Sequence, residues 1–170
     1  MKYHNITKDD MLNGDGLRVV LWVSGCSHKC PGCQNPITWN PDDGLEFDES
    51  AWNEIKDQLS KDYISGITFS GGDPLHENNV KETKELISKI RSEFPNKTIW
   101  LYSGYTYDYL KGSKKALDKI RLEVVENCDV FCDGPFIESL KDNNCHWVGS
   151  SNQNKDHHVI HLAQHAVDLR

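Results

Sequence analysis

The sequence of 170 residues lacks several features that would place it in familiar classes. It has no excess of basic residues, because 19 Lys and Arg stand against 26 Asp and Glu, which gives a formal net charge of −7. Binders of nucleic acids or anionic membranes are usually basic, so we expect neither as a partner. No apolar run is long enough to span a membrane, and the first residues lack the apolar core of a signal peptide. We therefore expect a cytoplasmic protein.

Internal repeats and low-complexity linkers are also missing. The length predicts one domain, and 37% hydrophobic with 26% charged residues is the composition of a globular protein. We assign residues 1–153 to this domain and residues 154–170 to a His-rich C-terminal tail. We expect the tail to be solvated, although two of its histidines, His161 and His165, could share a helix face and bind a metal.

Strand and helix patterns alternate along the chain, which predicts α/β units around a mostly parallel sheet. Leu17–Val23 is rich in Val, Leu and Trp, as buried strands are. Further strands are expected at residues 66–70, 98–102 and 128–132, with a last one near 159–162. Because 170 residues are too few for a full eight-stranded barrel, we expect a shortened, open (β/α) barrel, a partial TIM-like fold.

Three helices are expected between these strands. The first begins after the N-cap Asp48 and turns one apolar stripe inward, formed by Trp52, Ile55 and Leu59. The second runs from about residue 79 to 94 and ends before Pro95, which cannot continue a helix. The third covers residues 114–125 and is expected to turn two side chains inward, Leu117 and Ile120.

Polar or Gly-rich stretches follow four of the expected strands. They are the three-cysteine loop 26–33 and residues 71–74, 103–105 and 133–135. Parallel sheets bind ligands at the carboxyl ends of their strands. The four stretches are therefore expected to meet on one face and to line a pocket.

Cys26, Cys30 and Cys33 have the spacing C-x3-C-x2-C, and thiolates this close can hold one soft metal centre. The sequence lacks a neighbouring fourth cysteine, which structural zinc sites and simple electron-carrier clusters use. Three cysteines on a four-iron cluster would leave one iron open to a substrate or cofactor. A zinc loop completed by His28 or by a distant cysteine is an alternative, and three unconnected thiols are another.

The other three cysteines are not expected to hold a second cluster. Cys128 and Cys132 lie on a predicted strand, where buried cysteine is common. Cys145 lies in a polar loop and is expected to be an exposed thiol.

The cysteine spacing after a first strand resembles the signature of the radical-SAM superfamily. Six longer stretches are similar to the activating subunit of anaerobic ribonucleotide reductase, and they come in the same order along residues 1–153. They are residues 13–33 (NGDGLRVVLWVSGCSHKCPGC), 34–39 (QNPITW), 70–76 (SGGDPLH), 99–106 (IWLYSGYT), 128–136 (CDVFCDGPF) and 147–153 (WVGSSNQ). The cysteines indicate only the superfamily, whereas the small size and the GSSNQ ending indicate the narrower family.

This resemblance implies a 4Fe-4S cluster held by Cys26, Cys30 and Cys33, with S-adenosylmethionine on the fourth iron. One electron from a low-potential donor would cleave the cofactor to methionine and a 5′-deoxyadenosyl radical. The radical would take a hydrogen atom from a glycine near the C-terminus of the partner, the large catalytic subunit of the reductase. The chain would thus be a radical-SAM oxidoreductase that activates a glycyl-radical enzyme under anaerobic conditions.

The resemblance also implies contacts with the cofactor. Gly71 and Gly72 match a glycine-rich motif whose backbone meets the methionine amino group, although by itself this stretch is typical of an ordinary turn. Asp73 stands where many radical-SAM proteins carry Glu, and it would accept a hydrogen bond from that amine or shape the turn. Four further contacts are implied: Gly32 and Gln34 near the adenine, and Ser103 and Asp133 at later strand ends.

One departure and three alternatives remain. Relatives usually carry Arg in the WxGSSNQ segment where this sequence has Val148. A non-catalytic zinc module would not explain the glycine motif, and an electron-transfer protein should show a fourth cluster cysteine. A radical-SAM enzyme acting on a small molecule competes most closely. An open barrel favours a loop of a large protein as the substrate.

Overall fold

The computed structural model describes residues 1–158, the last three through their backbone alone, and seven strands form one mixed sheet. The order across the sheet is β3-β1-β2-β4-β5-β6-β7. The strands are β1 (Lys2–Asp10), β2 (Leu17–Val23), β3 (Leu45–Glu46), β4 (Ile64–Gly71), β5 (Thr98–Ser103), β6 (Val130–Asp133) and β7 (Asn154–His158).

The middle of the sheet is parallel and its edges are antiparallel. The pairs β2–β4, β4–β5 and β5–β6 are parallel, whereas β1 pairs antiparallel with β2 and β3, and β7 pairs antiparallel with β6. An open α/β sheet with a mostly parallel centre is confirmed, while its curvature into a partial barrel stays a prediction. The edge strand β7 begins in the segment that we assigned to the tail, and the expected strand at 159–162 lies outside the described residues.

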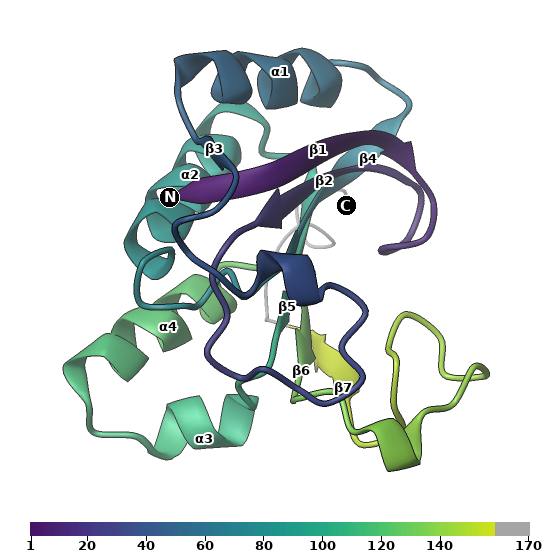
Figure 1. The fold of residues 1–170 in the computed structure, drawn as a ribbon. Helices are drawn as coiled ribbons and strands as arrows, with labels where there is room; N and C mark the ends of the chain where they lie inside the picture. The colour runs from purple at the N-terminus through teal and green to yellow at the C-terminus, as the bar shows by residue number, and fades with distance from the viewer. Residues whose placement is uncertain (159–170) are drawn as a thin grey trace, which may run out of the picture.

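Helices provide the crossovers between the parallel strands. Figure 1 shows the α-helices along the top and the left of the view, with irregular segments in front and at the lower right. They are α1 (Glu49–Leu59), α2 (Val80–Glu93), α3 (Tyr107–Gly112) and α4 (Ala116–Glu126), with two short 3-10 helices, η1 (Pro36–Thr38) and η2 (Glu138–Leu140). No helix among the described residues is both long and apolar enough to cross a membrane.

Helix α1 begins and packs as its sequence predicts. The Asp48 carboxylate accepts a hydrogen bond from the Ala51 amide at 3.0 Å, and Trp52, Ile55 and Leu59 are buried. Helix α2 likewise ends at its C-cap residue, Phe94, just before the proline. These helices cover the face of the sheet that holds the main apolar core.

Helix α4 packs the expected Leu117 and Ile120 against the main core, but its most deeply buried side chains are others. Leu117 and Ile120 are only half-buried, whereas Asp118 and Arg121 are buried together with valines further along the helix. The two charged side chains tolerate burial because Asp118 and Arg121 form an ion pair and Arg121 donates to the Leu75 carbonyl at 2.8 Å. Apolar spacing alone could not predict this pairing.

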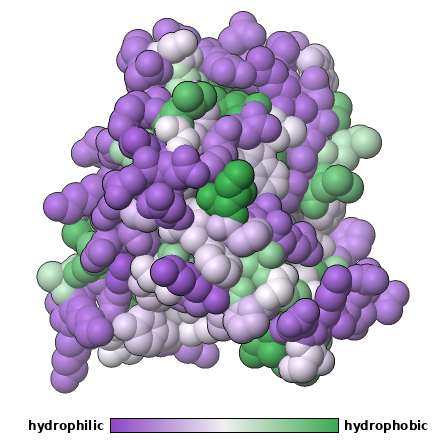
Figure 2. Space-filling view, viewed as in Figure 1, coloured by the Kyte–Doolittle hydropathy of each residue, from purple (hydrophilic) through white to green (hydrophobic). Residues whose placement is uncertain are grey.

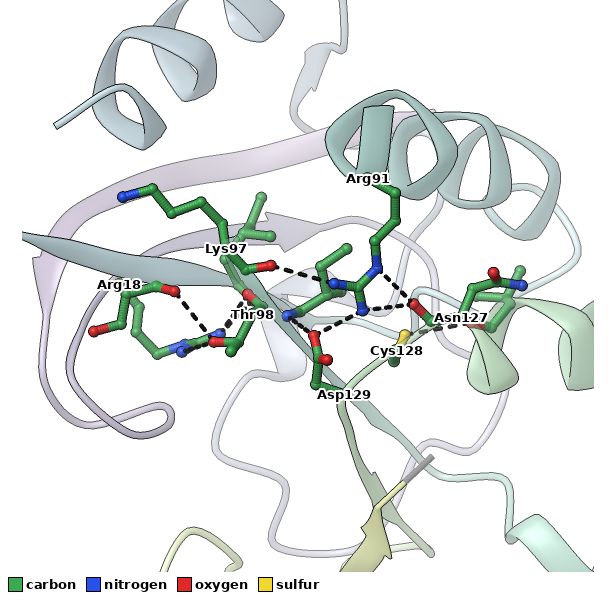
Figure 3. A network of polar contacts seen from close by, with 11 residues as sticks. Arg18, Arg91, Lys97, Thr98, Asn127, Cys128 and Asp129 are labelled. Atoms are coloured by element: carbon green, nitrogen blue, oxygen red, sulfur yellow. Dashed lines mark hydrogen bonds and ion pairs between the residues drawn. The ribbon is translucent and has the colours of Figure 1, made fainter. Parts of the chain in front are cut away.

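Polar contacts tie together the amino ends of the parallel strands, as Figure 3 shows. The fully buried Arg18 donates to the hydroxyls of Thr68 and Thr98, at 2.9 Å each. On α2, Arg91 donates to the Asp129 carboxylate at 2.7 Å, which also accepts the Ile99 amide at 2.6 Å. We call the seven labelled residues the amino-end network: Arg18, Arg91, Lys97, Thr98, Asn127, Cys128 and Asp129.

Burial lowers the pKa of Arg18 from 12.5 to about 10, although the nearby Asp129 carboxylate acts in the other direction. The charge is tolerated because the guanidinium also donates to the carbonyls of Asp15, Ile67 and Thr98. This end of the sheet is therefore closed by hydrogen bonds inside the protein.

Candidate functional site

The cysteine loop leaves the carboxyl end of β2 and is anchored at its base. The amides of Gly25 and Cys26 donate to the carbonyls of Thr38 and Trp39 at 2.7 and 3.1 Å. Two residues inside the loop adopt left-handed backbone conformations, Lys29 with φ 46° and Gly32 with φ 74°. These conformations turn the chain back on itself, so that Cys26, Cys30 and Cys33 lie on one short loop and all three are partly exposed.

The three thiols differ in burial and in the hydrogen-bond donors near them. Burial and the neighbouring Asp73 charge raise the pKa of Cys26 to about 11, against the lowering effect of hydrogen bonds from the His28 and Lys29 amides. The Asn35 amide lies 3.4 Å from Cys33 Sγ and points a donor at it. Backbone N–H groups aimed at sulfur are a common feature of iron–sulfur sites, because they stabilise thiolate charge.

The donors in the loop are of a type that iron–sulfur clusters use. Within residues 1–158, no three His, Cys, Asp or Glu side chains are placed to hold one metal ion. An iron–sulfur cube takes each thiolate on a different iron atom, so its ligands need not converge on one point. Three soft thiolates on one turn, with amides directed at two of them, are a donor set suited to such a cluster.

Gly71 and Gly72 bring the end of β4 against the cysteine loop. Gly71 has φ 101°, a backbone conformation that favours glycine. A Cβ on Gly72 would lie 2.6 Å from the Gly25 carbonyl oxygen and 2.9 Å from that of Thr38. The Gly72 amide already donates to the Val23 carbonyl at 2.8 Å. Both glycines are thus required by close approach of the backbone.

Asp73 is buried and joins three strand ends. Its Oδ1 accepts the Leu75 amide at 2.8 Å, and its Oδ2 accepts the Ser103 hydroxyl at 2.9 Å and the Gly104 amide at 3.2 Å. Nε2 of His28, in the cysteine loop, lies 2.9 Å from the same Oδ2. That contact is close but is not aligned as a hydrogen bond. We call these residues, with the aromatic ring beside them, the carboxyl-end network: His28, Asp73, Ser103, Gly104 and Tyr105.

The other predicted contact residues are less close together. A Cβ on Gly32 would lie 2.9 Å from the Glu138 carboxyl carbon, so this glycine allows the loop to approach η2. Gln34 lines a cavity beside Cys33. Asp133 is buried at the end of β6 and accepts the Tyr107 amide at 2.7 Å, which places it at the start of α3.

A cavity of about 430 Å³ opens beside the cysteine loop on the face of the sheet opposite the main core. Its lining comes from four parts of the chain: Leu12 and Asn13 from the connection between β1 and β2, Trp22, Ser70 and Tyr102 from the strands, Cys33, Gln34 and Asn35 from the loop, and Phe136, Cys145, Trp147, Val148, Gly149 and Gln153 from the segment between β6 and β7. Cys26 instead borders a second cavity of about 540 Å³ with Trp39 and His76.

The GSSNQ segment closes one side of the first cavity, which sequence reasoning missed. The side-chain Oε1 of Gln153 accepts the Gly149 amide at 2.9 Å, and the side-chain Nε2 donates to the Gly134 carbonyl at 2.9 Å. Trp147 has φ 68° and packs edge-on against Trp100, with ring centroids 5.8 Å apart. A bulky residue in this conformation signals local strain, which often accompanies a functional site.

The remaining cysteines have separate surroundings. Cys128 and Cys132 are buried, and burial raises the pKa of Cys128 strongly and that of Cys132 to about 12. Cys145 is partly exposed and lines the same cavity as Cys33, which its polar sequence context did not predict. His161 and His165 lie outside the described residues.

Comparison with known proteins identifies an iron–sulfur family. Residues 12–155 match the family described as 4Fe-4S single cluster domain, which defines the chain as a protein with one iron–sulfur cluster site. Anaerobic ribonucleoside-triphosphate reductase-activating proteins are similar over most of the chain. Those of Escherichia coli (strain K12) and Enterobacteria phage T4 are each 41% identical over 90% of this chain, covering 96% and 92% of the relatives.

A third relative gives the same result. The protein of this name from Vibrio cholerae is 37% identical over 95% of this chain and 97% of its own length. The chain belongs to the family of anaerobic ribonucleoside-triphosphate reductase-activating proteins.

Proposed function

We propose that this protein activates the large catalytic subunit of an anaerobic ribonucleotide reductase by placing a radical on a glycine near the C-terminus of that subunit. The observation that carries the proposal is the loop with three cysteines at the carboxyl end of β2, beside a cavity, in a chain of the activating family. The proposed activity is that of a radical-SAM oxidoreductase, which needs a low-potential electron donor, and the proposed location is the cytoplasm.

Cys26, Cys30 and Cys33 hold the 4Fe-4S cluster in this proposal. When bound and reduced by a low-potential donor, the cluster would supply the electron for reductive cleavage of S-adenosylmethionine. The protein determines where this happens. Its cysteine loop places the cluster ligands at the edge of the sheet where three other strand ends meet.

Backbone groups bind the cofactor in this proposal. Gly71 and Gly72 keep the end of β4 free of side chains, so that carbonyl oxygens can approach the methionine ammonium group. Gly32 and Gln34 flank Cys33 on the side of the adenine, and Gln34 already faces the cavity. Three buried polar residues order the strand ends around the cofactor: Asp73, Ser103 and Asp133.

The first cavity receives the glycine of the partner in this proposal. Aromatic rings of Trp22, Tyr102 and Trp147 line it and exclude water from a reactive radical. Exposed apolar side chains lie around its lining segments: Leu12 is 82% exposed and lines the cavity, and Ile37 is 67% exposed. Figure 2 shows a mostly hydrophilic face with apolar groups in its centre and at its lower edge. Such exposed patches favour a protein partner.

The test begins with anaerobic purification and reconstitution of the cluster. The protein is then incubated with dithionite and S-adenosylmethionine, and 5′-deoxyadenosine is measured. We expect a brown protein that forms this product, and we expect Cys30→Ala to lose at least about 100-fold in the rate of product formation. A colourless protein that holds zinc and leaves the cofactor intact would mean that the loop is structural.

Cys145→Ala is the matched control, because Cys145 lines the same cavity as Cys33. We expect this variant to keep its iron and its activity, because Cys145 is not one of the three proposed cluster ligands. Loss of the cluster in Cys145→Ala would make that residue a fourth ligand and would contradict an open iron.

The partner is tested separately. The wild-type protein is mixed with the large reductase subunit under the same reducing conditions, and an electron paramagnetic resonance spectrum is recorded. We expect a glycyl radical signal on the subunit that depends on S-adenosylmethionine. Product formation without that signal would support a radical-SAM enzyme that acts on a small molecule.

A further inference from the structure

The His28 ring packs directly against Gly104, the residue that follows β5. A Cβ on Gly104 would lie 2.4 Å from Cδ2 of the His28 ring and 2.5 Å from its Cγ. Gly104 has no left-handed backbone conformation, so backbone geometry does not require glycine there. The missing side chain instead leaves the space that the imidazole occupies.

Further contacts fix the ring on its other sides. The Tyr105 ring meets it edge-on, with centroids 4.7 Å apart and an interplanar angle of 77°. Nε2 lies 2.9 Å from Oδ2 of Asp73, which the Ser103 hydroxyl and the Gly104 amide hold in place.

A second layer of contacts supports Tyr105. The Arg121 guanidinium lies 4.4 Å from the centroid of the Tyr105 ring. Arg121 is itself fixed by the Leu75 carbonyl and by the Asp118 carboxylate. A continuous line of packed groups thus runs from α4 through Tyr105 to the cysteine loop.

We propose that His28 is a positioning residue: its ring, seated on Gly104, fixes the cysteine loop in the shape that binds the cluster before iron arrives. His28 lies two residues from both Cys26 and Cys30. Fixing it therefore limits the freedom of both ligands and lowers the entropy that cluster binding would otherwise cost. Asp73 then acts by fixing Ser103, Gly104 and His28 relative to one another, and the neighbouring backbone contacts the cofactor amine. The inference rests on the proposed function.

The first test compares two Gly→Ala variants. Gly104→Ala places a methyl group into the His28 ring, whereas a Cβ on the exposed Gly112 meets nothing within 4 Å. After reconstitution, we expect iron to leave Gly104→Ala about tenfold faster than wild type in a chelator, because outer contacts of metal ligands have effects of this size. Gly112→Ala should stay within about twofold of wild type. Equal rates for the two variants would overturn the proposal.

The second test asks whether Gly104 acts through His28. We expect His28→Ala to release iron about as fast as Gly104→Ala. In the double variant, Gly104→Ala should add less than about a twofold change, because the ring it displaces is already gone. Effects that multiply in the double variant would show that Gly104 and His28 act independently.

The third test needs no iron and so separates this inference from the proposed function. In metal-free protein, iodoacetamide labelling of each cysteine is followed by mass spectrometry. Gly104→Ala should raise the labelling rates of Cys26 and Cys30 about fivefold, since a loosened loop exposes thiols more often. Cys145 serves as the internal reference and should not change, and the melting temperature should stay close to that of wild type. Wild-type protein that binds no iron on reconstitution would reject the proposed function. Labelling rates of Cys26 and Cys30 that are unchanged in Gly104→Ala would reject the positioning role of His28.

Discussion

The two ends of the parallel strands both carry buried polar networks, but they are completed differently. At the amino-end network, Arg18 and Arg91 donate to hydroxyls, carbonyls and a carboxylate of the chain itself. Four buried side-chain atoms of the described residues lack a hydrogen bond, and none belongs to the amino-end network. Three lie in or beside the cysteine loop, and the fourth is on β1: Ser24 Oγ, His28 Nε2, Trp39 Nε1 and His4 Nε2.

This contrast separates stability from function. Unsatisfied buried polar atoms cost free energy, so a fold tolerates them mainly where a site needs them. The amino-end network is expected to hold the sheet together, and the carboxyl-end network is expected to hold ligands. Variants at each end test whether stability and ligand binding are separated in this way.

Arg18→Met should give the largest effect. It removes five hydrogen bonds and leaves the carbonyls of Ile67 and Thr98 without this donor. We expect the free energy of unfolding to fall by about 3 kcal/mol, measured by urea denaturation. The folded fraction should still bind iron at the wild-type ratio. A stable variant that failed to bind iron would contradict the claim that the amino-end network serves stability alone.

Asp129→Asn should give a smaller effect at the same end. The Asp129 carboxylate accepts hydrogen bonds from Arg91 and from the Ile99 amide. The neutral side chain of Asn would weaken the hydrogen bond from Arg91, because that bond is strengthened by the opposite charges. We expect the free energy of unfolding to fall by about 2 kcal/mol, seen as a lower urea midpoint. Iron content after reconstitution is the control and should not change.

Gly72→Ala tests the other end of the strands. The added methyl group would meet the carbonyl oxygens of Gly25 and Thr38, which are backbone atoms and cannot move without shifting the base of the cysteine loop. We expect cluster affinity to fall about tenfold, which is about 1.4 kcal/mol. The measurement is iron retained per chain in a chelator titration. A loss of stability with normal iron binding would place Gly72 among the structural residues.

Asp118→Asn should give the smallest effect, a loss of stability at neutral pH that disappears in acid. Burial alone raises the pKa of Asp118, but hydrogen bonds from Ser113, Arg121 and Tyr109 outweigh it and hold the pKa below 3.8. A carboxyl group with a lowered pKa stabilises the fold above 3.8, and this contribution is lost as pH falls through the lowered pKa. The variant should therefore show a shallower loss of melting temperature below pH 4 than wild type. Parallel curves for the two proteins would show that the carboxylate is not linked to folding.

The sequence predicts those parts of the fold that depend on neighbouring residues. Strand β2 has the predicted bounds, and Asp48 caps α1 as expected, because apolar runs and caps are local signals. Strand β1 was missed, since only Ile6 along it is fully buried and its composition is polar. The short helix α3 was missed as well, because none of the three expected helices covers Tyr107–Gly112.

The candidate site also has features that local sequence predicts and others that depend on the folded chain. The three cysteines are close in sequence, so their spacing was enough to predict a metal centre. The contact between His28 and Asp73, and the position of Cys145 at the cavity, depend on how distant strand ends pack together. No spacing rule reports such contacts. For the same reason, the tight approach of Gly72 to the Gly25 carbonyl could be known only from the folded chain.

The antiparallel pair of β1 and β2 also bears on the order of folding. Residues 11–16 connect the two strands, so they can pair as a hairpin within microseconds, whereas each parallel pair must wait for a crossover. Local pairing of this kind lowers the entropy cost of starting a sheet. The strand that leads into the cysteine loop is thus expected to be among the first to form, and later strands add to it one crossover at a time.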